Sequence, residues 1–173
     1  INSKWRNVSQ YNFIVNTNGK IEEFNASYTS EKAYLGAINL NNTLLSATLK
    51  NEKIEYNIGT TLELPKEKFP EGIGGLTTSA QFVFTSDTLK EVNASVNVPN
   101  STLMGSVKMK GVQLSLVKNQ NTDMLISLVG AVILPSSMPQ GLAGMEIGIQ
   151  KLTINKYGEF QDIDIGASNI STT

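Results

Sequence analysis

The feature that most constrains the fold of this chain is a Pro/Gly-rich stretch that occurs twice. LPKEKFPEGIGGL runs from Leu64 to Leu76, and LPSSMPQGLAGM runs from Leu134 to Met145. Such a recurrence is the sequence signature of a repeat architecture, in which each copy is one supersecondary unit. The residues that align, 69 or 70 positions apart, are Pro65 with Pro135, Pro70 with Pro139, Gly72 with Gly141, Gly75 with Gly144, and Leu76 with Met145.

Further matches keep this register, which a chance pair of turns would not produce. A third, partial copy follows, because Lys151 to Ile163 resembles Asn12 to Phe24. We therefore predict about two and a half copies: a partial first copy at 1–64, a complete second copy at 65–134 and a partial third copy at 135–173. The supporting pairs are Gly36 with Gly105, Leu45–Ser46 with Leu114–Ser115, Lys50–Asn51 with Lys118–Asn119, Phe13–Ile14–Val15 with Phe82–Val83–Phe84, and Asn25–Ala26–Ser27 with Asn93–Ala94–Ser95.

The copies either belong to a longer array or form one internally duplicated domain. The chain begins with Ile1 and both starts and ends in the middle of a copy. An array can be cut at any point, whereas a closed duplicated domain normally begins and ends on unit boundaries. This pattern favours a window on a longer repetitive protein. The alternative is an internally duplicated β-sandwich or β-barrel.

Within each copy the apolar residues alternate with a period of two. This period is typical of strands with one buried face, and no segment keeps the helical period over the length that a packed helix needs. The phase changes after Gly111, which indicates a bulge or turn there. We predict an all-β fold in which the copies stack as a solenoid or prism. The alternating runs are Ile54/Tyr56/Ile58, Phe82/Phe84, Val107/Met109, Val112/Leu114/Leu116 and Ile147/Ile149.

Each copy also contains a candidate hairpin. Asn18–Gly19 lies between apolar runs and predicts a type I′ turn, which requires positive φ at both central residues. Lys151 to Ile163 keeps the matching glycine, Gly158. The middle copy, FVFTSDTLKEV, is one residue shorter and has no glycine, so its turn type must differ.

We interpret the two Pro/Gly stretches as structural corners. A proline cannot donate to a strand ladder, so Pro65 and Pro135 end strands, and the glycines let the backbone turn before the next strand. The polar residues change from KEK to SS between the copies, which favours a structural role over a binding site. Four apolar residues are expected to tuck under neighbouring copies: Phe69, Ile73, Met138 and Leu142.

Composition narrows the possible functions. The chain has 173 residues, a formal net charge of -1 and neither histidine nor cysteine. It is long enough for a sizeable core, its charge gives no reason to expect nucleic acid, and no apolar run reaches the length of a membrane helix. The missing residues remove the commonest general base, the Ser-His and Cys-His pairs and thiolate zinc sites.

Two groups of acidic residues are candidate sites. Asp162–Ile163–Asp164–Ile165–Gly166 superficially resembles a calcium loop, but it lacks the third acidic ligand and the closing glutamate, and its isoleucines suggest the buried face of a strand. Glu22–Glu23 is the most visible carboxylate pair for glycosidase chemistry. Adjacent strand residues point to opposite faces, and the middle copy has Lys90–Glu91 instead, so solvated strand positions are favoured.

Aromatic and asparagine residues give weaker signals. Trp5, Tyr11, Tyr34, Tyr56 and Tyr157 could stack on sugars, but they are scattered, and packing in the core or at an edge is expected for each. Asn-X-Ser/Thr acceptors occur at Asn7, Asn25, Asn41, Asn93, Asn100 and Asn169 and matter only in a glycosylating export pathway. The sequence thus predicts no catalytic, cofactor-binding or metal-binding residue.

The favoured function is a non-catalytic structural or interaction module of a larger repetitive protein, at a cell surface or in a fibre or particle assembly. Its expected partners are neighbouring repeats or other subunits of the assembly. One alternative is a β-groove for a lipid or other apolar ligand, which requires the apolar face to stay open. Another is a carbohydrate-binding or carbohydrate-active β-solenoid, which requires an acidic cluster on one exposed face.

Overall fold

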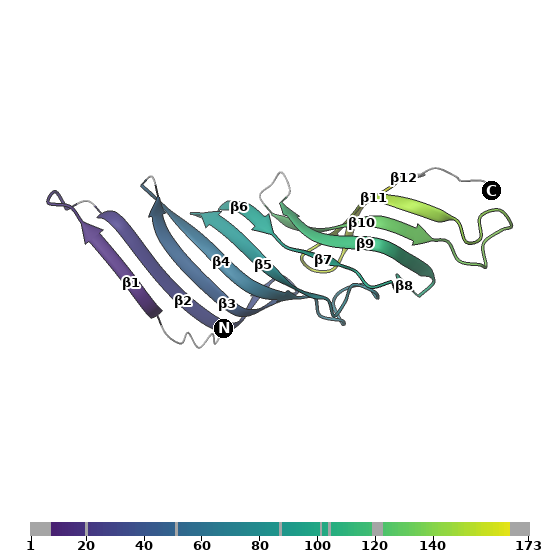
Figure 1. The fold of residues 1–173 in the computed structure, drawn as a ribbon, viewed down its shortest axis with the longest axis horizontal. Helices are drawn as coiled ribbons and strands as arrows, with labels where there is room; N and C mark the ends of the chain where they lie inside the picture. The colour runs from purple at the N-terminus through teal and green to yellow at the C-terminus, as the bar shows by residue number, and fades with distance from the viewer. Residues whose placement is uncertain are drawn as a thin grey trace.

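The fold consists of two antiparallel sheets joined end to end. A computed structural model describes residues 8–19, 21–50, 52–86, 88–100, 102–103, 105–118 and 123–166. The strands are β1 (Val8–Val15), β2 (Ile21–Leu35), β3 (Ile38–Lys50), β4 (Lys53–Glu63), β5 (Thr77–Thr85), β6 (Thr88–Asn93), β7 (Ser95–Asn97), β8 (Thr102–Leu103), β9 (Val107–Lys118), β10 (Met124–Ile133), β11 (Glu146–Asn155) and β12 (Phe160–Gly166). The molecule is elongated, with β1 and β2 at the left of Figure 1 and β10 to β12 at the right.

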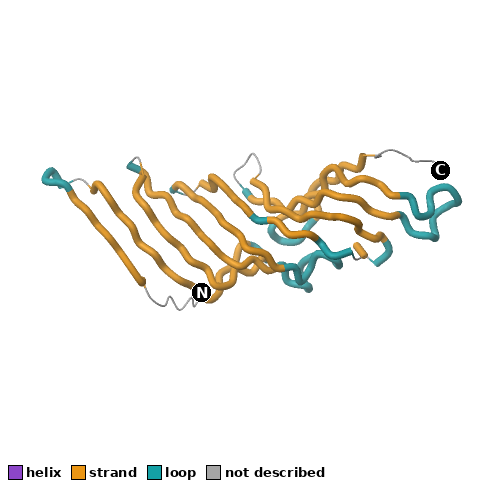
Figure 2. The backbone as a smooth tube through the Cα atoms, in the orientation of Figure 1, coloured by secondary structure: helices purple, strands orange, loops and turns teal. Residues whose placement is uncertain are grey.

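Both sheets are meanders of sequential strands. The first has the order β1-β2-β3-β4-β5-β6, and the second has the order β12-β11-β10-β9-β7, with β8 also paired to β9. The chain passes from one sheet to the other at Ala94, between the end of β6 and the start of β7. The buried Ala94 accepts a hydrogen bond from Leu116 N–H at 3.0 Å, which ties the crossing point to β9. Figure 2 shows strands along almost the whole described chain, with loops in the middle and at the two ends.

The all-β prediction is therefore confirmed, whereas the stacked array is not seen. The described residues form neither a closed barrel nor a solenoid. The sheets separate near residue 94, which is not one of the predicted copy boundaries at 64/65 and 134/135. Those boundaries stay a prediction.

Alternating burial places one apolar face of each sheet in a common core. In β9, Met109 lies on the buried face before Gly111, and Val112, Leu114 and Leu116 lie on it afterwards. The core contains residues of both sheets and of the first corner: Ile38, Leu40, Leu62, Leu64, Phe69, Ile73, Ala80, Phe82, Leu89, Ala94, Val98, Met109, Val112, Leu114, Leu116, Met124, Ile126, Leu128, Val132, Ile149, Leu152 and Ile154.

The expected change of phase at Gly111 is a β-bulge. Gly111 has a φ of 57°, and the β9–β10 pairing shifts between Val129 and Ala131. Gly130 lies opposite the bulge, where an added Cβ would be 2.6 Å from the Cα of Val112. A side chain at Gly130 would therefore push the two strands apart.

The β3–β4 pair has an irregularity at the matching place. Its register shifts between Asn41 and Leu44, and Asn42 has a φ of 51°. Here the hydroxyls of Thr43 and Thr60 lie 2.9 Å apart and are both buried. The same kind of backbone irregularity thus occurs in both sheets. In the first sheet a pair of threonines packs at it, and in the second sheet Val112 packs against Gly130.

All three expected hairpins form. In each of them the register of the strand pairing shifts at the same place relative to one residue pair that corresponds in the three hairpins. Phe13 pairs with Phe24 in β1–β2, Phe82 with Val92 in β5–β6, and Leu152 with Ile163 in β11–β12. In each case the next pair is regular and the shift follows it. The hairpins therefore share one pattern of pairing, although their turns differ in length.

The turn at Gly19 is not the predicted type I′ turn. Gly19 N–H donates to the Asn16 carbonyl at 3.0 Å, and Gly19 has a φ of 76°, but Asn18 is not among the residues with positive φ. A turn closed by one glycine of positive φ is typical of a longer hairpin loop with a bulge. The middle hairpin closes with two residues between Thr85 and Thr88, as its shorter sequence required.

Candidate functional site

The stretch that resembles a calcium loop is an exposed edge strand. Asp162 lies on β12 and pairs with Lys151 Nζ at 3.0 Å, with both side chains more than half exposed. Ile163 is 58% exposed, so the prediction that it lies on a buried face is wrong. The reason is that β12 is the edge strand of its sheet in the part of the chain that the structure describes. Within the described ranges, no group of three His, Cys, Asp or Glu side chains could hold a metal ion.

Among the side chains that the structure describes, the carboxylate candidates form no acidic cluster. The side chains of Glu22 and Glu23 lie outside the described residues, whereas Lys90 and Glu91 are exposed, as solvated strand positions require. Glu63 is half-buried, and its Oε2 accepts hydrogen bonds from the amides of Asn39 and Asn41 at 3.2 and 3.1 Å. These bonds, together with the charge of a nearby lysine, hold the pKa of Glu63 below its usual value.

Of the aromatic candidates, the structure describes the side chains of Tyr34, Tyr56 and Tyr157. Tyr34 and Tyr157 are 65% and 59% exposed, so of the two expected placements, core or edge, the core does not apply to them, while Tyr56 is half-buried. Trp5 and the side chain of Tyr11 lie outside the described residues. Among the glycosylation candidates, Asn93 and Asn100 are exposed, Asn41 is half-buried and hydrogen bonded, and Asn7, Asn169 and the side chain of Asn25 are not described.

The two corners share a backbone frame. We call Leu64–Leu76 the first corner and Leu134–Met145 the second corner. In each, the first and last residues are joined: Leu64 N–H donates to the Leu76 carbonyl at 3.0 Å, and Leu134 N–H donates to the Met145 carbonyl at 2.9 Å. The glycine before the last residue returns a bond to the first residue in both corners. The inner turns also match, with bonds from Ile73 to Pro70, Gly74 to Pro70, Leu142 to Pro139 and Ala143 to Pro139.

One exchange between the corners has a direct steric reason. The first corner is one residue longer, and an added Cβ on Gly74 would lie 2.9 Å from the Cα of Lys66. The shorter second corner has a methyl group at the matching position, Ala143. The two corners therefore have the same backbone structure, formed by two different sequences.

The first corner is covered by a later part of the chain. We call Asn155–Gly158, between β11 and β12, the last hairpin turn. Its Lys156 carbonyl accepts a hydrogen bond from Ala37 N–H at 2.8 Å, beside the corner. A Cβ on Gly158 would overlap the carbonyl oxygen of Lys68 and lie 3.6 Å from the Cα of Phe69. The last hairpin turn therefore lies directly on the first corner.

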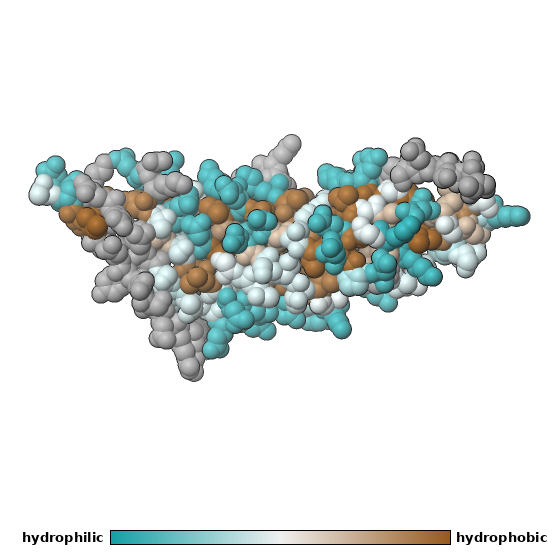
Figure 3. Space-filling model, in the orientation of Figure 1, coloured by the Kyte–Doolittle hydropathy of each residue, from teal (hydrophilic) through white to brown (hydrophobic). Residues whose placement is uncertain are grey.

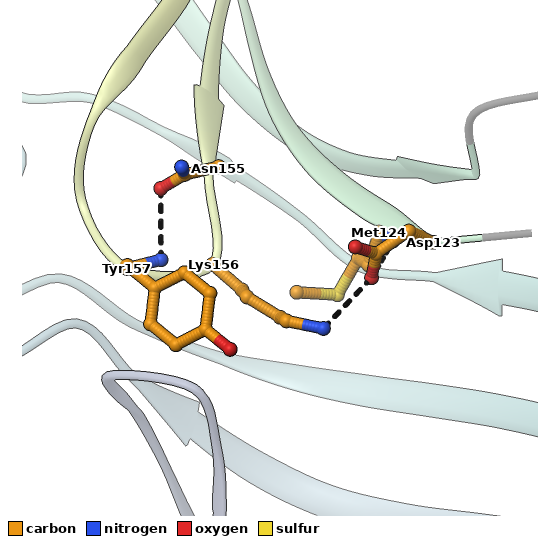
Figure 4. Close-up of polar contacts among 5 residues, drawn as sticks. All are labelled: Asp123, Met124, Asn155, Lys156 and Tyr157. Carbon is orange, nitrogen blue, oxygen red and sulfur yellow. Dashed lines mark hydrogen bonds and ion pairs between the residues drawn. The ribbon is translucent and has the colours of Figure 1, made fainter. Parts of the chain in front are cut away.

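Side chains of the last hairpin turn hold its shape (Figure 4). Asn155 Oδ1 accepts from Tyr157 N–H at 2.9 Å, and Lys156 Nζ donates to Asp123 Oδ1 at 3.0 Å. Asp123 also accepts from Met124 N–H at 2.8 Å. The Met124 N–H and then the Lys156 ammonium hold the pKa of Asp123 below its usual value. This ion pair anchors the turn to the loop that precedes β10.

The two corners differ in how far their apolar side chains are buried. Phe69 and Ile73 are 5% and 0% exposed in the first corner, whereas the matching Met138 and Leu142 are 37% and 43% exposed. All four residues were expected to tuck under neighbouring copies; the first pair is buried, whereas the second pair is exposed within this chain. The second corner projects at the right end of Figure 2 as an exposed loop.

The turn between β1 and β2 has the same construction as the last hairpin turn. We call Asn16–Gly19 the first hairpin turn. Asn18 N–H donates to Asn16 Oδ1 at 3.0 Å, as Tyr157 N–H donates to Asn155 Oδ1. Gly19 N–H bonds to the Asn16 carbonyl at 3.0 Å, and Gly158 N–H bonds to the Asn155 carbonyl at 3.1 Å. Unlike Gly158, Gly19 has no atom within 4 Å of an added Cβ.

A pocket of about 440 Å³ lies near the start of β9 and is lined by Asn100, Thr102, Lys108, Met109, Lys110 and Ile133. Lys110 Nζ is bound to Glu146 at 2.6 Å. The lining combines two lysine side chains with apolar surface and includes no carboxylate. This arrangement does not supply an acid and base pair for hydrolysis.

Comparison with known proteins gives no indication of function, so the corners and turns are the main features from which a function can be inferred. No protein-family model, curated protein or solved structure matches the chain. None of the segments that the structure describes is a helix with the length and apolar character of a membrane span. The sequence located both corners and both glycine turns, but it did not reveal that a turn lies on a corner. The glycines at matching places in the two turns could have indicated this contact, because a turn whose backbone lies against another segment has no room for a side chain.

Proposed function

We propose that this chain is a non-catalytic structural module, one stretch of a repetitive β protein in a surface, fibre or particle assembly. The proposal is carried by one observation: the last hairpin turn lies on the first corner, while the second corner, which has the same backbone hydrogen bonds, is exposed. In an array, the next copy would supply a turn to the second corner. Each joint would then repeat the contact between Gly158 and Lys68.

The energetics support such a joint. Burying a large apolar side chain contributes roughly 1.5–3 kcal/mol, and the first corner buries both Phe69 and Ile73 almost completely. Met138 and Leu142 retain more than a third of their exposure. A following copy would gain most of that unrealised burial, which is the usual way in which repeat proteins acquire stability from their neighbours.

The acidic and polar side chains also support a structural role. Asp123, Glu146 and Asp162 each pair with a lysine at a separate place on the surface. On β5, exposed Thr77, Ser79 and Gln81 alternate with the more buried positions. An uncharged polar face of this kind suits an extracellular or particle surface, which is the location we propose.

A β-groove for a lipid is supported less well. That function requires an apolar face open along its length. Instead, the buried faces of β9 and β10 belong to one core with residues of the first sheet and the first corner. The pocket beside Met109 and Ile133 is the place where a small apolar ligand would be sought first.

The array is tested by extending the chain by one copy. In the extended protein, a second copy of residues 96–166 follows Gly166, which matches Ser95 in the repeat register. The appended last hairpin turn should cover the second corner. Leu142→Ala should then cost as much stability as Ile73→Ala, and the denaturant slope should rise with the added buried surface.

The control is the same extended protein with alanine in place of the appended copy of Gly158. It should return the cost of Leu142→Ala to its value in the original chain. If Leu142→Ala costs the same in the original and extended chains, the appended turn does not cover the corner and the array is refuted. Turnover of a polysaccharide by the original chain would contradict the non-catalytic assignment.

A further inference from the structure

We propose that a second copy of this chain docks its first hairpin turn on the second corner, so that copies associate head to tail. This inference rests on the proposed function, since it uses the same turn-on-corner contact between molecules. The donor is Asn16–Gly19 and the acceptor is Leu134–Met145. The two lie at opposite ends of the long axis in Figure 1.

The donor turn has the features that the internal contact requires. In that contact, the glycine of the turn lies against the corner backbone without room for a Cβ, and the carbonyl two residues earlier accepts the Ala37 N–H. The first hairpin turn supplies Gly19 and the carbonyl of Thr17 at the same places. Thr17, Asn18 and Gly19 are exposed.

The acceptor has the same backbone frame as the first corner, but its apolar side chains are exposed. The second corner repeats the hydrogen-bonded frame of the first, and Gly105–Ser106 occupies the sequence positions that match Gly36–Ala37. The flanking pairs differ by one residue, because Leu35 pairs with Ile38 whereas Leu103 pairs with Val107. Gly36 has a φ of 62°, and a Cβ there would lie 2.6 Å from the Lys156 carbonyl oxygen. Gly105 has a φ of 78°, and the nearest atom to an added Cβ is Glu71 Oε2 at 3.9 Å, an ordinary van der Waals contact, so this glycine is far less closely packed than Gly36. In the docked pair, Ser106 N–H would bond the Thr17 carbonyl of the other copy, as Ala37 N–H bonds the Lys156 carbonyl.

Apolar surface accompanies both partners. Ile14, Val15 and Ile21 flank the donor turn and are each more than 40% exposed. Met138 and Leu142 supply the apolar surface of the acceptor. In Figure 3, brown apolar atoms reach the surface at the left end of the molecule, over β1 and β2. Contact between these surfaces would remove from water the residues that the fold itself leaves exposed.

The geometry predicts an open chain of copies. The donor and acceptor are different surfaces, so each copy that binds leaves a new acceptor exposed. Contacts of this heterologous kind form rings only if the rotation between copies closes, and otherwise form filaments. The elongated molecule, with its donor and acceptor at opposite ends, favours filaments.

The first test is sedimentation velocity of the full chain over a range of concentrations. The wild-type chain should form a series of oligomers that grows with concentration. A chain that remains monomeric up to about 1 mM, equivalent to a binding free energy weaker than about 4 kcal/mol, refutes docking by a second copy. A single dimer that does not grow further indicates a symmetric interface and also overturns the proposal.

Matched variants assign the two surfaces. Gly19→Asn keeps a residue that tolerates positive φ but adds a Cβ where the corner backbone must lie, and it should weaken association at least tenfold. Gly111→Asn makes the same change at another open glycine with positive φ and should leave association unchanged. Leu142→Asp should abolish association by placing a charge in the apolar contact, without affecting the monomer fold.

Mixing the variants gives the sharpest result. Gly19→Asn retains an acceptor and Leu142→Asp retains a donor, so each should be monomeric alone and the mixture should stop at one-to-one dimers. Failure of the mixture to dimerise, or association by either variant alone at the wild-type level, overturns the proposal. If the extended protein covers Leu142 but separate copies do not associate, the array stands and only docking between copies is refuted.

Discussion

Truncating the same corner position in its covered and exposed versions should have unequal effects. Ile73 and Leu142 occupy matching places in two corners with the same hydrogen bonds, but Ile73 is 0% exposed and Leu142 is 43% exposed. Ile73→Ala removes a fully enclosed side chain and leaves a cavity. Leu142→Ala removes a side chain that water already reaches.

The expected magnitudes follow from this difference. Truncation of a buried isoleucine costs about 2–5 kcal/mol, because the lost transfer free energy is added to the cost of the cavity. We expect about 3 kcal/mol for Ile73→Ala. At Leu142 only part of the side chain is buried and no closed cavity remains, so about 1 kcal/mol or less is expected.

Urea unfolding of the two variants and the wild-type chain measures both values. The protein concentration must be low enough that every sample is monomeric. The denaturant slopes should agree, so that the midpoints report stability alone. In thermal unfolding, a difference of about 2 kcal/mol between the variants corresponds to roughly 4–8 °C for a domain of this size. Equal losses from the two variants would show that the complete burial of Ile73 gives the first corner no more stability than the second corner has.

Two other comparisons test the same contact. Gly158→Ala should destabilise the chain by at least about 1 kcal/mol more than Gly19→Ala, because both replace glycines of positive φ but only the first adds an overlap with Lys68; urea unfolding would show this, and equal losses would contradict it. The depressed pKa of Asp123 stabilises the fold above about pH 4, and this contribution is lost as the pH falls through the lower folded value. Asp123→Asn should therefore flatten the acid limb of a stability curve, and an unchanged limb would show that the contacts of the carboxylate with Met124 N–H and Lys156 do not contribute.

Local features of the fold were readable from the sequence because they depend on short-range geometry. The alternation of apolar residues predicted strands, and the change of phase after Gly111 predicted a bulge that the structure contains. The prolines marked the ends of β4 and β10. Even here the type of turn at Gly19 was wrong, because the side chain of Asn16 bonds the Asn18 N–H and helps to close a longer loop.

Only the tertiary structure decided which of the two corners is covered by a hairpin turn. The first corner meets the last hairpin turn across more than eighty residues of sequence, and no local pattern states which corner will receive a turn. Ile163 shows the same limit, since its alternation suggested burial but its strand lies at the edge of the sheet. The sequence by itself determined two equivalent corners and three hairpins, because turn chemistry acts over a few residues. The tertiary structure decided that Ile73 is buried and Leu142 exposed, because burial depends on what the rest of the chain places above each corner.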